Sequence, residues 1–274
     1  MTAQWVQLGG GQTLVASRKG AWIQSHQAAT LEVGGPMPPS HAGTVETTRH
    51  LLDGVIAAAQ RGQAPGQDWP PTPRRWALAL VDQWYTAHHS VALLPIAIDR
   101  YASMHRPELA RFARRKLEEE TGHDRLPLED LRALGYEAQA TVERVPPGRT
   151  ARALVQLARE CVHGPRSVGF FGYIYALERR VIQLDSEALR ALDSALPRGV
   201  DAASGVRAHA AEFDRRHVED LVEFVAGLPA HDRTEIALTC HRTAAIFCTP
   251  PPADDTQDTE RERRLAAHQP TARS

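Results

Sequence analysis

The chain has 274 residues, of which 42% are hydrophobic and 24% charged, as in an ordinary globular protein. Its formal net charge of −1 gives no basic field for nucleic acid or an anionic membrane. Cys161, Cys240 and Cys248 form no CxxC pair, which argues against a structural zinc site or a disulfide framework. No apolar run approaches the roughly 20 residues of a membrane span, and no signal-peptide pattern opens the chain, so we expect a cytoplasmic protein.

Residues 1–72 differ in composition from the rest and predict a β-rich N-terminal extension. Segments rich in Val, Ile, Thr and Trp between glycines are typical of short strands. We interpret the extension either as a packing segment or dimer arm, or as a recognition module for a substrate presented on a carrier or peptide. Strands are expected at residues 5–8, 12–17, 21–25 and 29–33, a helix at 44–60, and a Pro- and Gly-rich linker at 62–73.

Residues 73–248 predict an antiparallel helical bundle, because no strand pattern interrupts their helical periodicity. Pro95 is expected to kink or split the first helix, and Asp232 with Glu235 fits a capping box for the last. The polar tail, residues 249–274, is expected to be disordered. The expected helices are residues 74–104, 106–123, 127–134, 148–163, 166–184, 186–195, 201–227 and 232–248.

Glu120 and His123 make the first candidate metal-ligand pair. Their spacing of three places both side chains on nearly the same face of a helix. The Glu-x-x-His step is the one that di-iron carboxylate bundles use. Glu119, four residues before His123, is a competing ligand, and a solvated acidic helix end is the alternative interpretation.

Glu178 is the second candidate ligand, and it ends a strongly apolar run, GFFGYIYAL. An isolated carboxylate in such a helix needs a partner, because a buried unpaired charge is costly. A metal ion would supply the pairing. A salt bridge to Arg179, Arg180 or another arginine is the alternative.

Asp214 and His217 repeat the spacing of three in a later helix, and His209 lies two turns before His217. The alternative is an amphipathic helix whose polar face meets water. Taken together, the three helices offer three carboxylates and three imidazoles. This ligand set suits iron or manganese, and the lack of thiolates argues against structural zinc.

These motifs give the chain a resemblance to the haem-oxygenase-like di-metal oxidases, within the wider superfamily of thiaminase-like and pyrroloquinoline-quinone-synthase-like bundles. EEETGHD with the following LPLEDLRALGY is similar to the family's Glu-Glu-x-x-His-Asp helix and its "DL..LG" segment. GFFGYIYALE is similar to its small-aromatic helix, and FDRRHVEDL to its Asp-x-x-His helix. The resemblance covers roughly residues 75–248.

The resemblance implies a haem-oxygenase-like bundle that binds two Fe(II) ions, or a manganese–iron pair, at Glu120, His123, Glu178, His209, Asp214 and His217. It also implies an oxidoreductase that activates dioxygen to oxidise a small molecule, such as an amino-acid derivative or a natural-product intermediate. Bundles of this kind often form homodimers. The family shows His-x-x-x-Asp-x-x-His, whereas His209 stands one residue early, so a π-bulge would be needed to bring His209 and Asp214 to a common metal.

A water-poor pocket is expected around such a centre. His88 and His89 are candidates for hydrogen bonds to the ligands, although ordinary half-exposed helix histidines are the alternative. The side chains expected to wall the pocket are Phe170, Phe171, Tyr173, Tyr175, Trp84, Tyr85 and Phe213.

Two other classes of protein remain open. One is a cofactor-free thiaminase-like hydrolase, with Cys161 near His163 as its nucleophile, or a quinone-cofactor synthase on the same bundle. The other is a non-enzymatic helical binding protein. Iron content and ferrous-dependent oxygen uptake would separate the di-iron enzyme from both.

Overall fold

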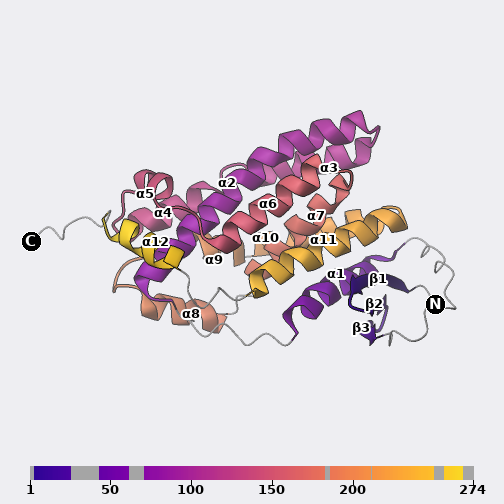
Figure 1. Ribbon diagram of the computed structural model, residues 1–274, viewed down its shortest axis with the longest axis horizontal. Helices are drawn as coiled ribbons and strands as arrows, with labels where there is room; N and C mark the ends of the chain where they lie inside the picture. The colour runs from indigo at the N-terminus through magenta and orange to yellow at the C-terminus, as the bar shows by residue number, and fades with distance from the viewer. Residues whose placement is uncertain are drawn as a thin grey trace, which may run out of the picture. The chain divides into compact units, whose positions relative to one another are not determined.

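The computed structural model describes residues 3–25, 43–61, 71–182, 186–210, 212–249 and 256–267, without the side chains of residues 209–215, 256 and 257. Most of these residues are helical, and a three-stranded sheet lies near the N-terminus (Figure 1). The expected mainly α fold with a small β-rich N-terminal extension is therefore confirmed. Within the described residues, no helix combines the length and the apolar character that crossing a membrane requires.

The chain divides into two compact units, each built from segments that are distant in sequence. Unit 1 comprises residues 1–63, 160–180 and 214–249. It thus joins the N-terminal extension to the end of the helical region, whereas the sequence suggested a boundary near residue 73. Its elements are β1 (Gln4–Gly9), β2 (Gln12–Ser17), β3 (Gly20–Ser25), α1 (Val45–Gln60), η1 (Ser167–Gly169), α11 (Ala230–Cys248) and most of α7 (Phe170–Ile182) and α10 (Glu212–Ala226).

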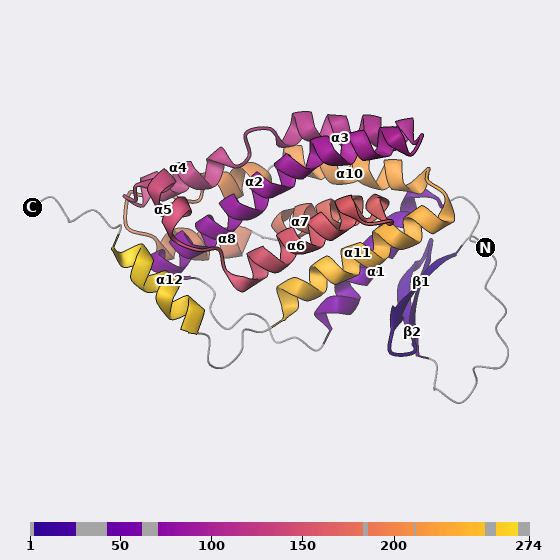
Figure 2. The same cartoon turned by 45° about the horizontal axis from the view of Figure 1, so that its top comes forward.

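The three strands form an antiparallel sheet in the order β1-β2-β3, which packs beside α1 (Figure 2). Val6 pairs with Leu14 across the sheet, and both side chains are fully buried, as expected for the inward face of a strand with period-2 alternation. Gly54 of α1 permits the close approach, since a Cβ there would lie 2.8 Å from Cβ of Ala21. The strands predicted at residues 5–8, 12–17 and 21–25 are confirmed. The fourth predicted strand, residues 29–33, lies outside the described residues.

A buried polar network ties the sheet to two helices of unit 1. The side-chain amide of Gln4 donates to Thr47 and Thr48 of α1, at 2.7 and 2.9 Å. Nε of Arg233, on α11, donates to Oε1 of Gln4 at 2.7 Å, and its guanidinium also donates to the Leu228 carbonyl. These hydrogen bonds satisfy groups that would otherwise be costly to bury. The N-terminal strands are therefore an integral part of unit 1.

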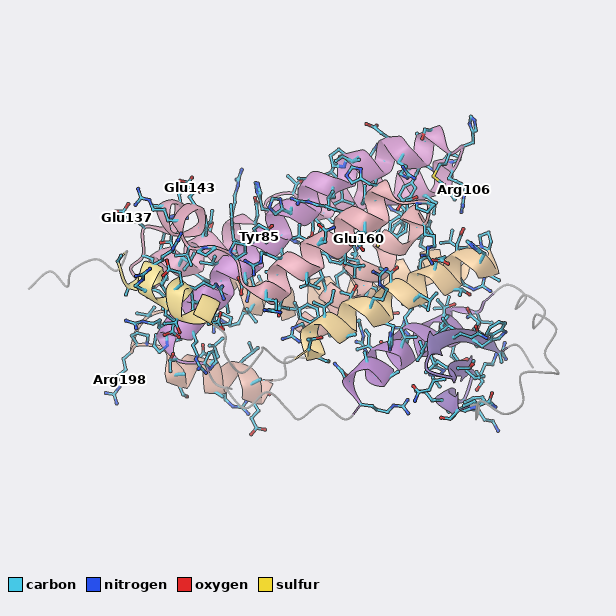
Figure 3. The ribbon with its side chains drawn as sticks, in the orientation of Figure 1. Tyr85, Arg106, Glu137, Glu143, Glu160 and Arg198 are labelled. Carbon is cyan, nitrogen blue, oxygen red and sulfur yellow. The ribbon has the colours of Figure 1, made fainter. Side chains whose placement is uncertain are left out.

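Unit 2 comprises residues 64–159, 181–213 and 250–274. Helices α2 and α3 lie side by side and are joined by a tight turn at His105 and Arg106 (Figure 3). The elements are α2 (Pro73–Ser103), α3 (Pro107–Glu120), α4 (Arg125–Ala133), α5 (Ala138–Arg144), most of α6 (Arg149–His163), α8 (Ser186–Ala195), α9 (Ser204–Ala210) and α12 (Thr256–Ala266). Its core includes Trp76, Leu80, Val81, Leu131, Leu192 and Leu265.

Several helix boundaries differ from the sequence prediction. Helix α2 continues through Pro95 as one element, because buried side chains on both sides of the proline, such as Leu93 and Ile98, hold the helix in place by packing. Helix α11 begins at Ala230 after Pro229 as N-cap, so the expected capping box of Asp232 is wrong. The helix expected over 201–227 begins at Ser204, and its two described parts, α9 and α10, lie on either side of residue 211, which is outside the described residues. Helix α5 was not expected from the sequence.

The tail also departs from the prediction, because residues 256–266 form α12 instead of being disordered. Two of its side chains are anchored in unit 2. Leu265 is fully buried, and the guanidinium of Arg261 donates to Asp82 of α2 at 2.6 Å and to the Pro146 carbonyl at 2.9 Å. A segment with low hydrophobicity can still order when a few groups find such partners.

Candidate metal centre

Glu120 is the last residue of α3, and His123 lies beyond the helix end. The chain turns at Gly122, whose φ of +95° is a conformation that favours glycine. The turn is closed by a hydrogen bond of 3.1 Å from His123 N to the Glu120 carbonyl. Nδ1 of His123 then lies 2.8 Å from Oε2 of Glu120. The expectation that both residues share one helix face is therefore wrong; a turn brings them together.

The neighbouring carboxylate, Glu119, has a different partner. Its Oε2 lies 2.9 Å from Nζ of Lys116, which is 1% exposed. A buried ammonium group requires such a counter-charge. These contacts favour Glu120 over Glu119 as the ligand that accompanies His123. Lys116 was not singled out from the sequence, although its spacing of three and four residues from the two glutamates was a signal for it.

Glu178 and His217 approach each other within unit 1, from α7 and α10. Their candidate ligand atoms lie within 4.8 Å of one another, and His217 is buried. Helix α7 is held tightly against α11 at Gly172, where a Cβ would lie only 2.0 Å from the Ile236 carbonyl oxygen. Helices α7 and α10 thus present the Glu178 carboxylate and the His217 imidazole at a distance that a single metal ion could bridge.

The arginines that follow Glu178 are engaged with other groups. Nε of Arg179 donates to Oδ1 of Asp53 at 2.8 Å, and the guanidinium of Arg180 lies over the Phe247 ring, 4.2 Å from its centroid. These contacts weaken the alternative interpretation in which Glu178 serves as the salt-bridge partner of one of these arginines.

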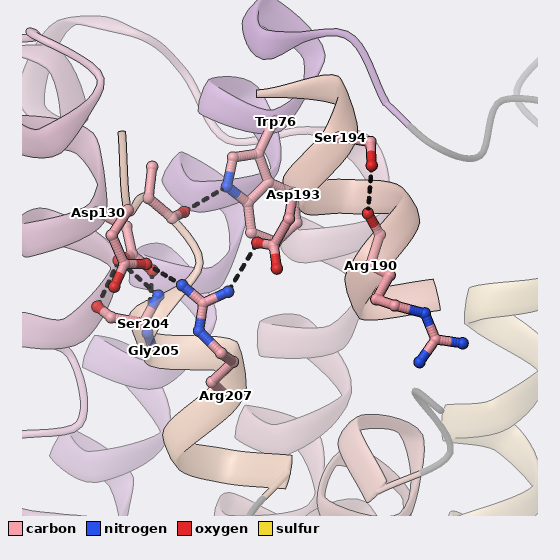
Figure 4. Close-up of polar contacts among 10 residues, drawn as sticks. Trp76, Asp130, Arg190, Asp193, Ser194, Ser204, Gly205 and Arg207 are labelled. Atoms are coloured by element: carbon pink, nitrogen blue, oxygen red, sulfur yellow. Dashed lines mark hydrogen bonds and ion pairs between the residues drawn. The ribbon is translucent and has the colours of Figure 1, made fainter. Parts of the chain in front are cut away.

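His209 and Asp214 belong to α9 and α10, and their side chains lie outside the described residues, as does residue 211. Their proposed ligation and the π-bulge therefore remain predictions. The start of α9 is fixed by Asp130 of α4 (Figure 4). Its carboxylate accepts from Ser204 N and Oγ, at 3.1 and 2.6 Å, and from Gly205 N at 3.1 Å, which satisfies backbone donors at the helix start.

The two adjacent histidines of α2 have partners within unit 2. His88 stacks on Trp84, and its Nδ1 lies 3.0 Å from Oδ2 of Asp124, the residue that follows His123. His89 meets the edge of Tyr85, with ring centroids 4.4 Å apart. Burial, with the positive field of Arg159, lowers the pKa of His89. His88 thus contacts the turn that carries His123.

The expected wall residues of α7 are buried. Phe170, Phe171, Tyr173 and Tyr175 have no exposed surface, and the Tyr175 hydroxyl donates to Asp53 at 2.8 Å. Trp84 and Tyr85 are partly exposed, and the side chain of Phe213 lies outside the described residues.

Cys161, the candidate nucleophile of the hydrolase interpretation, is 7% exposed. Burial raises the pKa of its thiol, against a hydrogen bond from Thr239. Because the thiolate is the nucleophile, this environment does not favour nucleophilic catalysis by Cys161 at neutral pH.

Two solved structures are similar to the chain along most of its length. One is a domain of unknown function with a haem oxygenase-like fold from Shewanella denitrificans, with a TM-score of 0.58 and 16% identity over 83% of this chain and 94% of that one. The other is a TenA homologue from Pseudomonas syringae pv. tomato, with a TM-score of 0.56 and 13% identity over 87% and 99%. No protein-family model and no curated protein matches the chain. The chain thus has a haem oxygenase-like helical fold.

Proposed function

We propose that the chain is a non-haem di-iron oxidase or oxygenase that uses two Fe(II) ions, or a manganese–iron pair, and dioxygen to oxidise a small molecule. The oxidation would be a hydroxylation, a desaturation, an N-oxygenation or a C–C cleavage, with amino-acid derivatives and natural-product intermediates as the substrate class. The observation that carries the proposal is the approach of Glu178 and His217 to within 4.8 Å, next to a buried aromatic run that offers no other polar side chain but the tyrosine hydroxyls.

Glu178 and His217 are proposed as ligands of one metal ion, and their candidate ligand atoms lie within 4.8 Å of one another. Glu120 is proposed as a further ligand. His123, hydrogen-bonded to Glu120, is proposed as a ligand from the same turn. Asp214 and His209 would complete a two-metal set. Carboxylate and imidazole donors without thiolate fit iron and manganese. Burial raises the pKa values of Cys161 and Cys240, which disfavours the thiolate form that binds a metal.

In the proposed chemistry, the protein holds the metal ions, orients their ligands and shields the site from water. The contact between Glu120 and His123 fixes the orientation of both side chains before a metal binds, as contacts around metal ligands commonly do. The aromatic side chains of α7 exclude water, which protects a reactive oxidant from side reactions. Bound ferrous iron would supply part of the electrons that dioxygen reduction requires, and the oxidised substrate would supply the rest.

The same fold is compatible with a thiaminase-like enzyme that uses no metal. Such an enzyme would depend on a reactive cysteine, and the raised pKa of the buried Cys161 thiol counts against it. The approach of Glu178 and His217 is a second observation that the metal-dependent function explains. The likeness to solved structures is equally compatible with both functions, and these two observations are why we propose the metal-dependent one.

Anaerobic titration with ferrous iron, followed by exposure to oxygen, tests the proposal. Mössbauer and optical spectra would follow the iron. We expect about two irons per chain, and severe loss of iron binding and oxygen consumption in Glu178→Ala and His217→Ala. Matched controls are Glu223→Ala, an exposed carboxylate on α10, and His231→Ala, a histidine 78% exposed. No iron binding by the wild-type protein, or full activity in both ligand variants, would overturn the function.

A further inference from the structure

Helix α1 belongs to the N-terminal extension, yet it contacts the two helices that carry Glu178 and His217. On the α7 side, Oδ1 of Asp53 accepts two hydrogen bonds, both of 2.8 Å. One comes from the Tyr175 hydroxyl and the other from Nε of Arg179. These donors lie three residues before and one residue after Glu178. A single carboxylate of α1 therefore holds the segment of α7 that presents the candidate ligand.

On the α10 side, Arg49 makes the corresponding contact. It is one turn before Asp53 on α1, and its guanidinium forms an ion pair with Glu219, two residues after His217. The negative charges of Asp53 and Glu219 both act on Arg179. Positive and negative groups thus alternate across α1, α7 and α10, so that each charge lies near charges of the opposite sign. The four groups are Asp53, Arg179, Glu219 and Arg49.

Helix geometry explains how α1 can act without touching a metal ion. Side chains advance by roughly 100° per residue around a helix. Arg179 therefore projects about a quarter turn from Glu178, and Glu219 about half a turn or slightly more from His217. The contacts of Arg179 and Glu219 with α1 therefore lie on other faces of α7 and α10 than the two candidate ligands, whereas Tyr175, three residues before Glu178, lies nearer the face of Glu178. They fix the rotation of both helices, and with it the direction in which Glu178 and His217 point.

We propose that Asp53 and Arg49 are positioning residues for the metal centre, so that the N-terminal extension sets the separation of Glu178 and His217. The inference rests on the proposed function, because it concerns metal ligands. It gives α1 a specific role, beyond the packing and recognition roles considered for the extension. Removing a residue that orients metal ligands without binding the metal itself typically weakens metal affinity by about 10- to 100-fold.

The experiment uses the metal-free full-length chain and Co²⁺ as a spectroscopic probe, whose visible absorption reports the number and arrangement of its ligands. Asp53→Ala removes the acceptor for both bonds on α7. Asp53→Asn retains an acceptor oxygen and serves as the conservative variant. Glu160→Ala is the matched control, because Glu160, on α6 (Figure 3), pairs with Arg242 at 3.3 Å within unit 1 and contacts neither ligand-bearing helix in this pair.

We expect Asp53→Ala to weaken Co²⁺ binding about tenfold or more and to alter the absorption spectrum, while its metal-free circular dichroism stays that of the wild type. Asp53→Asn should recover most of the affinity, and Glu160→Ala should bind as the wild type does. A purely structural role of Asp53 would lower the thermal stability but leave the spectrum of the bound Co²⁺ unchanged.

The outcomes separate this inference from the proposed function. Co²⁺ binding by the wild type with equal affinity and spectrum in Asp53→Ala would overturn the positioning role alone. No Co²⁺ binding by the wild type would overturn both. If Asp53→Ala does not fold, Arg49→Gln decides, because Arg49 is partly exposed and its loss breaks only the α1–α10 ion pair: weakened binding supports the inference, and wild-type binding overturns it.

Discussion

Nδ1 of His123 lies 2.8 Å from Oε2 of Glu120, although α3 ends at Glu120. In a continuous helix, the spacing of three would have placed the two side chains one turn apart on one face. The left-handed φ of Gly122 instead folds the chain back and leaves His123 in a turn. The geometry of this candidate ligand pair therefore depends on one glycine that carries no functional group.

Gly122→Ala is expected to destabilise the protein and to weaken ferrous iron binding. No atom lies within 4 Å of the position that a Cβ would take, so the cost is backbone strain, about 1–2 kcal/mol for an L-residue held in a left-handed conformation. Urea unfolding of the metal-free protein measures the stability, and iron titration measures the binding. Gly227→Ala is the control, because Gly227 also follows a helix but lacks a positive φ and meets its nearest atom at 3.5 Å. Equal losses in the two variants would contradict the role of Gly122.

The sequence was most informative where helical periodicity is strong and extends over several turns. The helices expected at 148–163 and 186–195 are observed at Arg149–His163 and Ser186–Ala195. Short or polar elements were harder to predict from the sequence. Helix α12 depends on Arg261 and Leu265, whose partners come from distant parts of unit 2, and a composition-based argument contains no information about those partners.

The same limit applies to the candidate metal centre. Spacing within one helix or turn was enough to pair Glu120 with His123. The contact of Asp53 with Tyr175 joins residues 122 positions apart, and no local pattern distinguishes Asp53 from an ordinary surface carboxylate. Contacts of this kind become apparent only when the tertiary packing of α1 is known.

A chain that begins near Pro73 is expected not to fold stably. It would lack α1, whose buried Leu51, Leu52, Val55 and Ile56 each contribute about 1.5–3 kcal/mol, a sum comparable with the whole stability of a typical domain. Circular dichroism and size-exclusion chromatography would test this. A point variant gives the finer measurement: Leu52→Ala should lower the free energy of unfolding by about 2–5 kcal/mol, whereas Trp22→Ala, at a side chain 44% exposed, should cost much less. Undiminished helicity in the truncated chain would contradict the integral role of the extension.

Asp130 is expected to make stability depend on pH. Burial raises its pKa above the ordinary value of 3.8, although the donors of Ser204 and Gly205 act to lower it. A carboxyl group whose pKa is higher in the folded than in the unfolded state stabilises the fold when it is protonated. Its contribution is therefore fully present below the unfolded pKa and is lost as the pH rises through the folded pKa.

Urea unfolding from roughly pH 3 to pH 7 in the wild type and in Asp130→Asn measures this contribution. The wild-type free energy of unfolding minus that of Asp130→Asn should fall as the pH rises through the window and then level off. The Ser204 hydroxyl donates to Asp130 at 2.6 Å, and this hydrogen bond lowers the pKa of Asp130. Ser204→Ala removes the hydrogen bond, so the fall in the free-energy difference should move to higher pH. A difference that grows with pH would mean that the hydrogen bonds at the start of α9 outweigh the cost of burying the charge.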